Sequence, residues 1–167
     1  MTVTRKLEIT TPSPREMAMT RAFDAPRELV WKALTTPALL QRWLTGMPGW
    51  TLEVCEVDLR VGGAYRFVWR QESGDRATMG MGGEYREVAA PVRYAATELF
   101  DEPWYPGEAL VTTELEADGD RTILTTTVLY ASEEARDGVL ASGAATGVDL
   151  SYDRLDGVLA DEVKRDG

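Results

Sequence analysis

Histidine is absent from this 167-residue sequence. Imidazole is the commonest metal ligand in proteins and the commonest general base near neutral pH. Its absence excludes histidine zinc sites and hydrolases built on Ser-His or Cys-His pairs. We therefore predict no metal site, and we predict no cofactor.

Cysteine is nearly absent, since Cys55 is the single example. One cysteine excludes an internal disulfide. Cys55 lies in an alternating apolar and polar stretch, residues 52–57, which favours a strand with the thiol on its inner side. We predict a buried, unreactive thiol, because most free cysteines are buried as small apolar residues.

Long apolar runs and a basic surplus are also missing. No segment approaches the roughly 20 apolar residues needed to cross a bilayer. The first residues lack the apolar region of a secretory signal, so we predict a cytoplasmic protein. A formal net charge of -10 disfavours nucleic-acid binding, because little positive charge is available to neutralise phosphates.

The length is that of one domain. Residues 1–15 carry two prolines without clear periodicity and predict a flexible tail or edge extension; residues 16–162 form the predicted single domain. Residues 17–23 alternate as a strand. A helix is expected over 27–34, with its cap at Asp24 or Ala25. A second short helix is expected to start at Thr36-Pro37, to carry Leu39, Leu40 and Trp43 on one face, and to be ended by Gly46, Pro48 and Gly49.

The middle of the chain has the period-two pattern of strands. Six segments share it, at residues 51–59, 64–71, 78–88, 93–100, 109–117 and 121–131. No helix interrupts them, so they predict an antiparallel meander.

A long helix is predicted from the cap at Ser132 to about residue 160. Three- and four-residue steps predict one buried stripe along it, made of Leu140, Ala144, Val148, Ser151, Leu155 and Leu159. Its interior contains Gly138, Gly143, Gly147 and Gly157, each costing roughly 1 kcal/mol relative to alanine. Two explanations are open. Close packing on the sheet is the favoured one, and direct backbone contact with a ligand is the other.

Several motifs resemble those of a known family. They include residues 21–26 (Arg-Ala-Phe-Asp-Ala-Pro), 30–31 (Val-Trp), 35–37 (Thr-Thr-Pro), 42–43 (Arg-Trp), 58–63 and 83–85. With the element order they resemble the START-like (SRPBCC) superfamily, and within it the bacterial homologues of the heat-shock-protein-90 ATPase activator. The resemblance implies an α+β helix-grip fold, in which a curved antiparallel sheet of about seven strands wraps around a long C-terminal helix, with two short helices after the first strand.

The resemblance also implies an internal cavity, and the strand faces suit one. Side chains of one parity are mostly aromatic or methionine, as in many small-molecule sites. The alternative is a solid core packed to crystal-like density. The predicted ligand-binding residues are Tyr65, Phe67, Trp69, Met79, Met81, Tyr85, Glu98, Phe100, Leu140, Ala144 and Gly147.

Glu98 is the acidic member of this set. Against aromatic side chains its pKa would rise, and it could act as an acid or base. The favoured alternative is an ion pair with Arg66, Arg70 or Arg93, or exposure at a strand end. Trp50, Trp104 and Tyr105 are expected near the cavity mouth, either gating a ligand or contacting a partner, or plugging the end of the barrel.

Three functional hypotheses follow. The leading one is a non-catalytic domain that binds a small apolar or aromatic ligand. The second is a protein-interaction module resembling the chaperone ATPase activators, with a chaperone or another protein as partner. The weakest is a cyclase or hydrolase using a cavity carboxylate with Tyr65 or Tyr85. Exposed sheet edges make a homodimer plausible.

Overall fold

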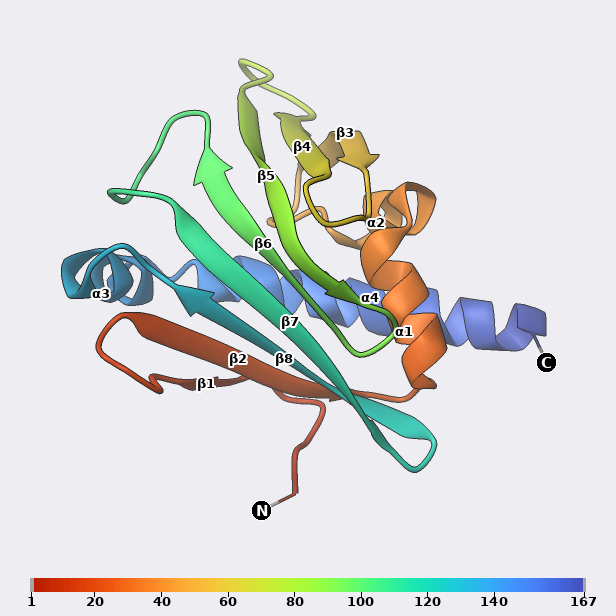
Figure 1. Cartoon of the computed structure of the whole chain (residues 1–167). Coiled ribbons are helices and arrows are strands. Elements are labelled where there is room, and N and C mark those ends of the chain that lie inside the picture. Colours follow the sequence, from red (N-terminus) through yellow and green to blue (C-terminus); the bar gives the residue numbers. More distant parts are fainter. Residues whose placement is uncertain (1, 167) are drawn as a thin grey trace.

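The computed structural model describes residues 2–166, in which one curved antiparallel sheet is combined with four helices (Figure 1). The strands are β1 (Glu8–Thr10), β2 (Glu16–Phe23), β3 (Trp50–Val57), β4 (Ala64–Gln71), β5 (Thr78–Ala89), β6 (Arg93–Phe100), β7 (Ala109–Asp118) and β8 (Arg121–Leu129). The helices are α1 (Arg27–Thr35), α2 (Pro37–Trp43), α3 (Glu133–Ser142) and α4 (Ala145–Asp166). The predicted α+β helix-grip fold is confirmed.

The sheet has the order β1-β2-β8-β7-β6-β5-β4-β3. β3 to β8 form the predicted meander, and β2 pairs with β8 at its far side. The eighth strand, one more than about seven, is β1, which pairs with β2 along one edge within the segment expected as a tail. Thr4 extends this attachment, since its carbonyl accepts a 2.9 Å hydrogen bond from the Ala22 amide.

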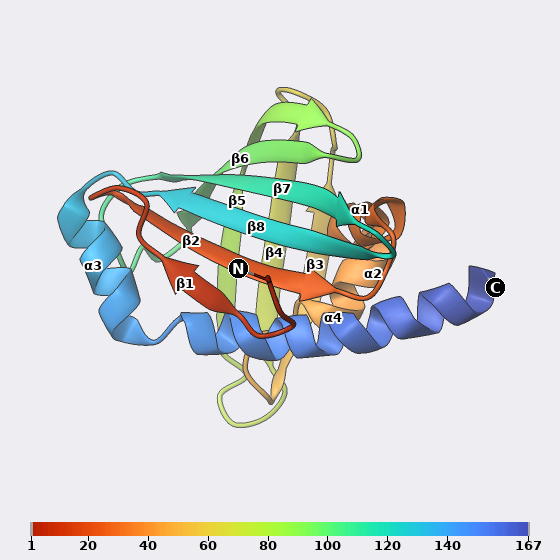
Figure 2. The same cartoon turned by 90° about the horizontal axis from the view of Figure 1, so that it is seen from below.

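The sheet bends strongly, so that β3, β4 and β5 cross the direction of β2, β7 and β8 (Figure 2). Two register shifts contribute, one between Leu52 and Val54 and one between Tyr85 and Glu87. Such bulges bend and twist a strand. Next to the second bulge, a side chain at Gly83 would collide with the Thr97 carbonyl, so only glycine permits the close approach of β5 and β6.

α1 and α2 fold as predicted, with one difference at the start of α1. Its N-cap is Pro26, whose side chain makes no capping hydrogen bond, rather than Asp24 or Ala25. Asp24 instead lies 3.2 Å from the Arg5 guanidinium. Pro37 is the first residue of α2, where its missing N–H costs nothing. The Trp43 indole donates to the Ala33 carbonyl at 2.9 Å and joins the two helices.

The prediction of one continuous helix after Ser132 was wrong. Ser132 does cap α3, accepting a hydrogen bond from the Ala135 amide at 3.1 Å. α3 then ends at Gly143, whose φ of 75° is left-handed, and α4 begins at Ala145. Glycine adopts this conformation without steric cost and commonly ends helices. Gly143 is therefore a helix stop, and the predicted stripe does not run through it.

Close packing on the sheet does not explain the helix glycines. An added Cβ at Gly138, Gly143, Gly147 or Gly157 would have no neighbouring atom within 4 Å. Gly138 and Gly157 face solvent, Gly143 ends α3, and Gly147 faces the space between helix and sheet.

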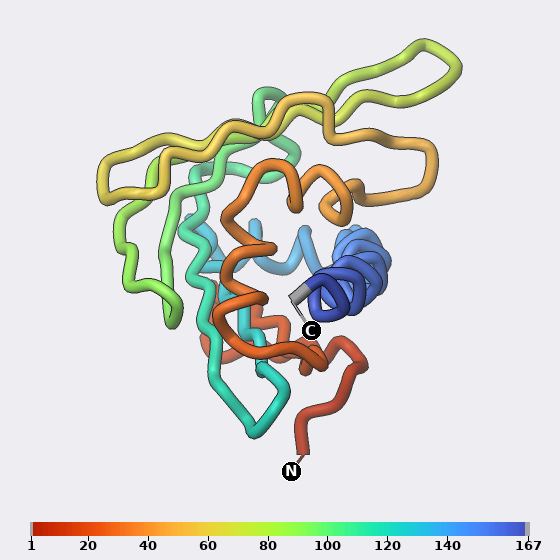
Figure 3. Tube along the Cα trace, turned by 90° about the vertical axis from the view of Figure 1, so that its right-hand side faces the viewer, coloured from red at the N-terminus to blue at the C-terminus, as the bar shows by residue number. Residues whose placement is uncertain are grey.

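The apolar core lies between the concave face of the sheet and the helices (Figure 3). Its largest cluster joins α1, α2 and the second half of α4 to the sheet around Phe23, Leu124 and Leu155, all fully buried. A smaller cluster, around Met17, Tyr130 and Val139, joins α3 to β2 and β8. Within residues 2–166 no helix is both long enough and apolar enough to span a membrane.

Candidate functional site

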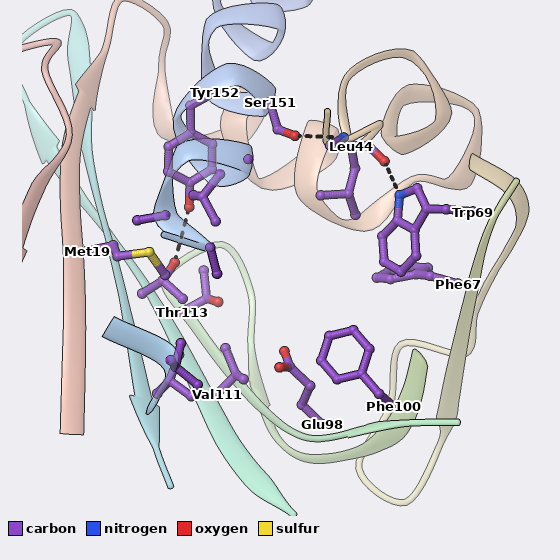
Figure 4. A pocket seen from close by; sticks show the side chains of 18 of the residues that line it. Met19, Leu44, Phe67, Trp69, Glu98, Phe100, Val111, Thr113, Ser151 and Tyr152 are labelled. Carbon is purple, nitrogen blue, oxygen red and sulfur yellow. Dashed lines mark hydrogen bonds between the residues drawn. The ribbon is translucent and has the colours of Figure 1, made fainter. Parts of the chain in front are cut away.

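A cavity of about 590 Å³ lies between the concave face of the sheet and the first half of α4 (Figure 4). It has the volume typical of small-molecule sites. Every strand from β2 to β8 contributes side chains, α3 and α4 supply the opposite wall, and Leu34, Leu40 and Trp43 add to the lining from α1 and α2. The segment 44–47 after α2 closes one side, and Met47, Met79 and Trp104, each 44–50% exposed, mark the rim.

The structure distributes the eleven predicted site residues over three places. Seven line the main cavity: Phe67, Trp69, Met79, Glu98, Phe100, Ala144 and Gly147. Tyr65, Met81 and Tyr85 line a smaller cavity of about 120 Å³, to which Phe67 and Glu98 also contribute. Leu140 lines neither cavity and is 37% exposed on α3, because the break at Gly143 turns α3 away from the direction of α4.

Glu98 is the single acidic residue among those that line the main cavity. Its carboxylate points into the space between Val111 and Phe100 (Figure 4). One oxygen accepts a 2.9 Å hydrogen bond from the Tyr105 hydroxyl. Apolar side chains surround the carboxylate otherwise, although the cavity itself leaves part of its surface uncovered.

The expected ion pair of Glu98 with an arginine was wrong. Arg66 pairs with Asp101, Arg70 with Glu53, and Arg93 with both Glu87 and Glu114. The strand alternation places these arginines on the opposite face of the sheet from the cavity. Within residues 2–166, Glu98 has no cationic side chain within salt-bridge distance.

Burial raises the pKa of the Glu98 carboxyl, and the hydrogen bond from Tyr105 opposes part of that rise. Burial, with the nearby Glu98 charge as a further cause, also raises the pKa of Tyr65, Tyr105 and Tyr130. Glu98 is thus faced by three neutral phenols, from β4, from the β6–β7 loop and from the end of β8.

Other polar groups of the cavity are mostly bonded within the protein. The Tyr152 and Thr126 hydroxyls lie 3.4 Å apart, and the Ser151 hydroxyl accepts from the Gly46 amide at 3.1 Å. The Trp69 indole donates to the Leu44 carbonyl at 2.8 Å. The Ser151 and Trp69 bonds tie α4 and β4 to the segment 44–47, and Glu98 is the one carboxylate among the residues that line the cavity.

Trp50, Trp104 and Tyr105 all line the cavity. Tyr105 is 8% exposed, and its ring packs edge-on against Tyr130 with centroids 5.3 Å apart. Trp104 is 45% exposed and packs against Phe100 and Tyr105 at 5.9 and 5.1 Å. Tyr105 therefore belongs to the wall, while Trp104 covers the rim.

Sequence reasoning missed part of the lining. Met17 and Met19 project from β2, and their alternation in the predicted strand was an available signal. Tyr152 was missed because the predicted stripe along the helix passed through its neighbour, Ser151. The segment 44–47 carried no signal, since its place depends on how α2 packs against α4.

Asp58 and Arg60 pair with each other at the turn before β4, where the Arg60 guanidinium donates to the Asp58 carboxylate at 3.0 Å. Cys55 is half-buried, and burial raises the pKa of its thiol to about 11, which keeps it protonated and weakly nucleophilic at neutral pH. Among residues 2–166 no group of three acidic or cysteine side chains is placed to hold a metal ion.

Comparison with known proteins agrees with this architecture. The family model described as "Activator of Hsp90 ATPase homolog 1-like protein" matches residues 24–160. A crystal structure from Rhodobacter sphaeroides is similar at 37% identity and a TM-score of 0.88, covering 93% of this chain and 99% of that one. No curated protein matches the chain.

More distant structures share the fold. A Mycobacterium smegmatis protein is 23% identical with a TM-score of 0.78, covering 91% of this chain and 95% of that one. An AHSA1-like protein from Aeromonas hydrophila is 20% identical with a TM-score of 0.67, covering 84% and 93%. Because the family model spans most of the sequence, the chain belongs to the family of proteins like the activator of Hsp90 ATPase homolog 1.

Proposed function

We propose that this protein binds a small apolar or aromatic molecule in the cavity between its sheet and α4. The observation that carries the proposal is the cavity itself, about 590 Å³ in volume and lined mainly by aromatic, methionine and aliphatic side chains. A well-packed core of this size leaves few voids larger than a water molecule. Burying a ligand's apolar surface there gains roughly 25 cal/mol per Å² before the costs of association.

Titration with a neutral aromatic probe, 4-phenylbutanol, tests the proposal. Binding should change the fluorescence of the tryptophans that line the cavity, and native mass spectrometry should show one probe per chain. Mass spectrometry of the freshly purified protein would also reveal a ligand retained from the cell.

A matched pair of variants locates the binding site. Gly147→Leu places a side chain at the cavity wall, where a Cβ has no neighbour within 4 Å, and should weaken probe binding at least tenfold. Gly157→Leu adds the same side chain to the exposed side of α4 and should leave binding within twofold. Equal affinities for both variants, or no probe binding to the unaltered protein, would overturn the proposal.

A second candidate function is regulation of a chaperone ATPase, which family membership favours. Its test is the ATPase rate of a purified heat-shock-protein-90 chaperone with and without this protein. Stimulation that survives Gly147→Leu would assign this function to a surface other than the cavity.

We do not extend the proposal to catalysis. Of the two tyrosines considered as partners of Glu98, Tyr65 donates its hydroxyl to the Thr97 carbonyl at 2.7 Å. Tyr85 lines only the smaller cavity. Among the residues that line the main cavity, Glu98 has no second carboxylate with which to divide acid and base roles.

A further inference from the structure

Glu98 is an acidic group placed in a mainly apolar cavity without an intramolecular counter-charge. Its one hydrogen bond within the described chain comes from Tyr105 and uses Oε1, which leaves Oε2 facing the cavity. Burying a carboxylate is costly unless a partner compensates it. The uncompensated carboxylate lies at the wall of the cavity, where a bound ligand could supply the missing partner.

The ionic character of the cavity is entirely negative. No lysine or arginine is among the residues that line it. Arg66 and Arg93 are paired on the other face of the sheet, and Arg154, which reaches the lining segment 44–47, donates to the Gly46 carbonyl at 2.7 Å. The whole chain carries a formal net charge of -10, which also attracts cations. An anionic ligand, such as a fatty acid, would meet repulsion at Glu98 and no compensating cation.

Aromatic rings stand beside the carboxylate. Phe100 lies two positions along the same strand, and Phe67, Trp69 and Trp104 line the same cavity. The faces of aromatic rings attract organic cations, most strongly where water is excluded. A carboxylate among such rings therefore favours a ligand that is positively charged at one end and apolar elsewhere.

We propose, building on the binding function above, that the natural ligand is a hydrophobic amine whose ammonium group pairs with Glu98 while its apolar or aromatic body packs against Phe67, Trp69 and Phe100. The ammonium donates to the free oxygen of Glu98, and Tyr105 holds the other oxygen in place. A neutral ligand would fill the same space but leave the carboxylate without a counter-charge.

Three probes of one shape test the inference: 4-phenylbutylamine, 4-phenylbutanol and 4-phenylbutanoate. Their affinities for the unaltered protein are measured by calorimetry at pH 7. The amine should bind at least tenfold more tightly than the alcohol, and the carboxylate should bind most weakly. The ranking of the three probes is measured on the unaltered protein, so it tests the amine inference even if a substitution at Glu98 impairs folding.

Two variants test whether Glu98 causes the preference for the amine probe. Glu98→Gln should weaken amine binding at least tenfold, to the level of the alcohol, while alcohol binding stays within twofold. Glu116→Gln removes the same charge from an exposed position on β7 and should leave the ranking unchanged.

Different results would overturn the cavity proposal and the amine inference. Binding of the alcohol as tightly as the amine, or an amine preference that survives Glu98→Gln, would overturn the amine inference and leave the cavity proposal standing. Failure of all three probes to bind would overturn the cavity proposal, and the amine inference with it.

Discussion

The two halves of α4 differ in what they do, although they form one helix. Residues 151–162 present Tyr152, Leu155, Val158 and Leu159 to α1, α2 and the sheet, and all four are at most 6% exposed. Residues 145–150 contain no fully buried side chain, and Gly147 and Val148 face the cavity. The second half mainly completes a solid core, with Ser151 and Tyr152 at its start also lining the cavity, and the first half forms one wall of the hollow space. The fold can retain a cavity beside residues 145–150 because residues 151–162 supply most of the stabilising contacts of this helix.

Matched leucine truncations test this contrast most strongly. Leu155→Ala removes a fully buried side chain from the packed half and should lower the free energy of unfolding by about 2–5 kcal/mol. Leu150→Ala makes the same change at a half-buried position in residues 145–150 and should cost much less. Chemical denaturation measures both, and equal losses would show that the first half of α4 is packed as tightly as the second.

Matched glycine replacements test the junction between α3 and α4. Gly143→Ala puts a Cβ at a φ of 75° and should destabilise the protein by about 1–2 kcal/mol. Gly157→Ala, on the exposed side of the packed half, should stabilise it by about 1 kcal/mol through helix propensity. A gain at both positions would mean that α3 and α4 can join into one continuous helix.

The pH dependence of stability should have opposite signs at two glutamates. The folded-state pKa of Glu98, which faces Tyr65, Tyr105 and Tyr130, is raised by burial. Its stabilising contribution is full below the unfolded pKa and is lost as pH rises through the folded pKa, by no more than about 1.4 kcal/mol per pH unit.

Glu162 in the packed half behaves in the opposite way. Arg42 donates to it at 2.9 Å and lowers its pKa, so its contribution is present above the unfolded pKa and is lost as pH falls through the folded one. Thermal unfolding measured across pH should therefore show that Glu98→Gln removes a loss of stability on the alkaline side. Glu162→Gln should remove a loss of stability on the acidic side. Parallel profiles for the two variants would contradict the contrast between a hollow and a packed region.

Local patterns predicted most of the fold. Residues 64–71 and 93–100 form strands with the predicted bounds, and α2 starts at the predicted proline, because proline, glycine and alternation act on immediate neighbours. The sequence pattern alone could not distinguish a helix break at Gly143 from a glycine inside a continuous helix. The pattern also could not choose between a tail and an edge extension for residues 1–15, since the pairing of β1 with β2 depends on tertiary contacts and not on its own short sequence.

The site was less predictable than the fold. Strand parity placed Phe67, Trp69, Glu98 and Phe100 at the cavity, because side chains alternate along every strand. Leu140 was placed there by extending a periodicity across the helix break. The partners of Glu98 depended on which face of the sheet each arginine occupies and on the β6–β7 loop that brings Tyr105 inward, and neither follows from spacing along the chain.

The pairing of β2 with β8 has a consequence for synthesis. Arg21 on β2 reaches Asp153 and Asp156 on α4, and Phe23 packs against Tyr152, so the first long strand meets its partners more than 100 residues later. Such distant pairings slow folding, and a growing chain exposes its unpaired apolar strands in the meantime. On the ribosome, β2 therefore stays without its partners in β8 and α4 until those segments have been synthesised.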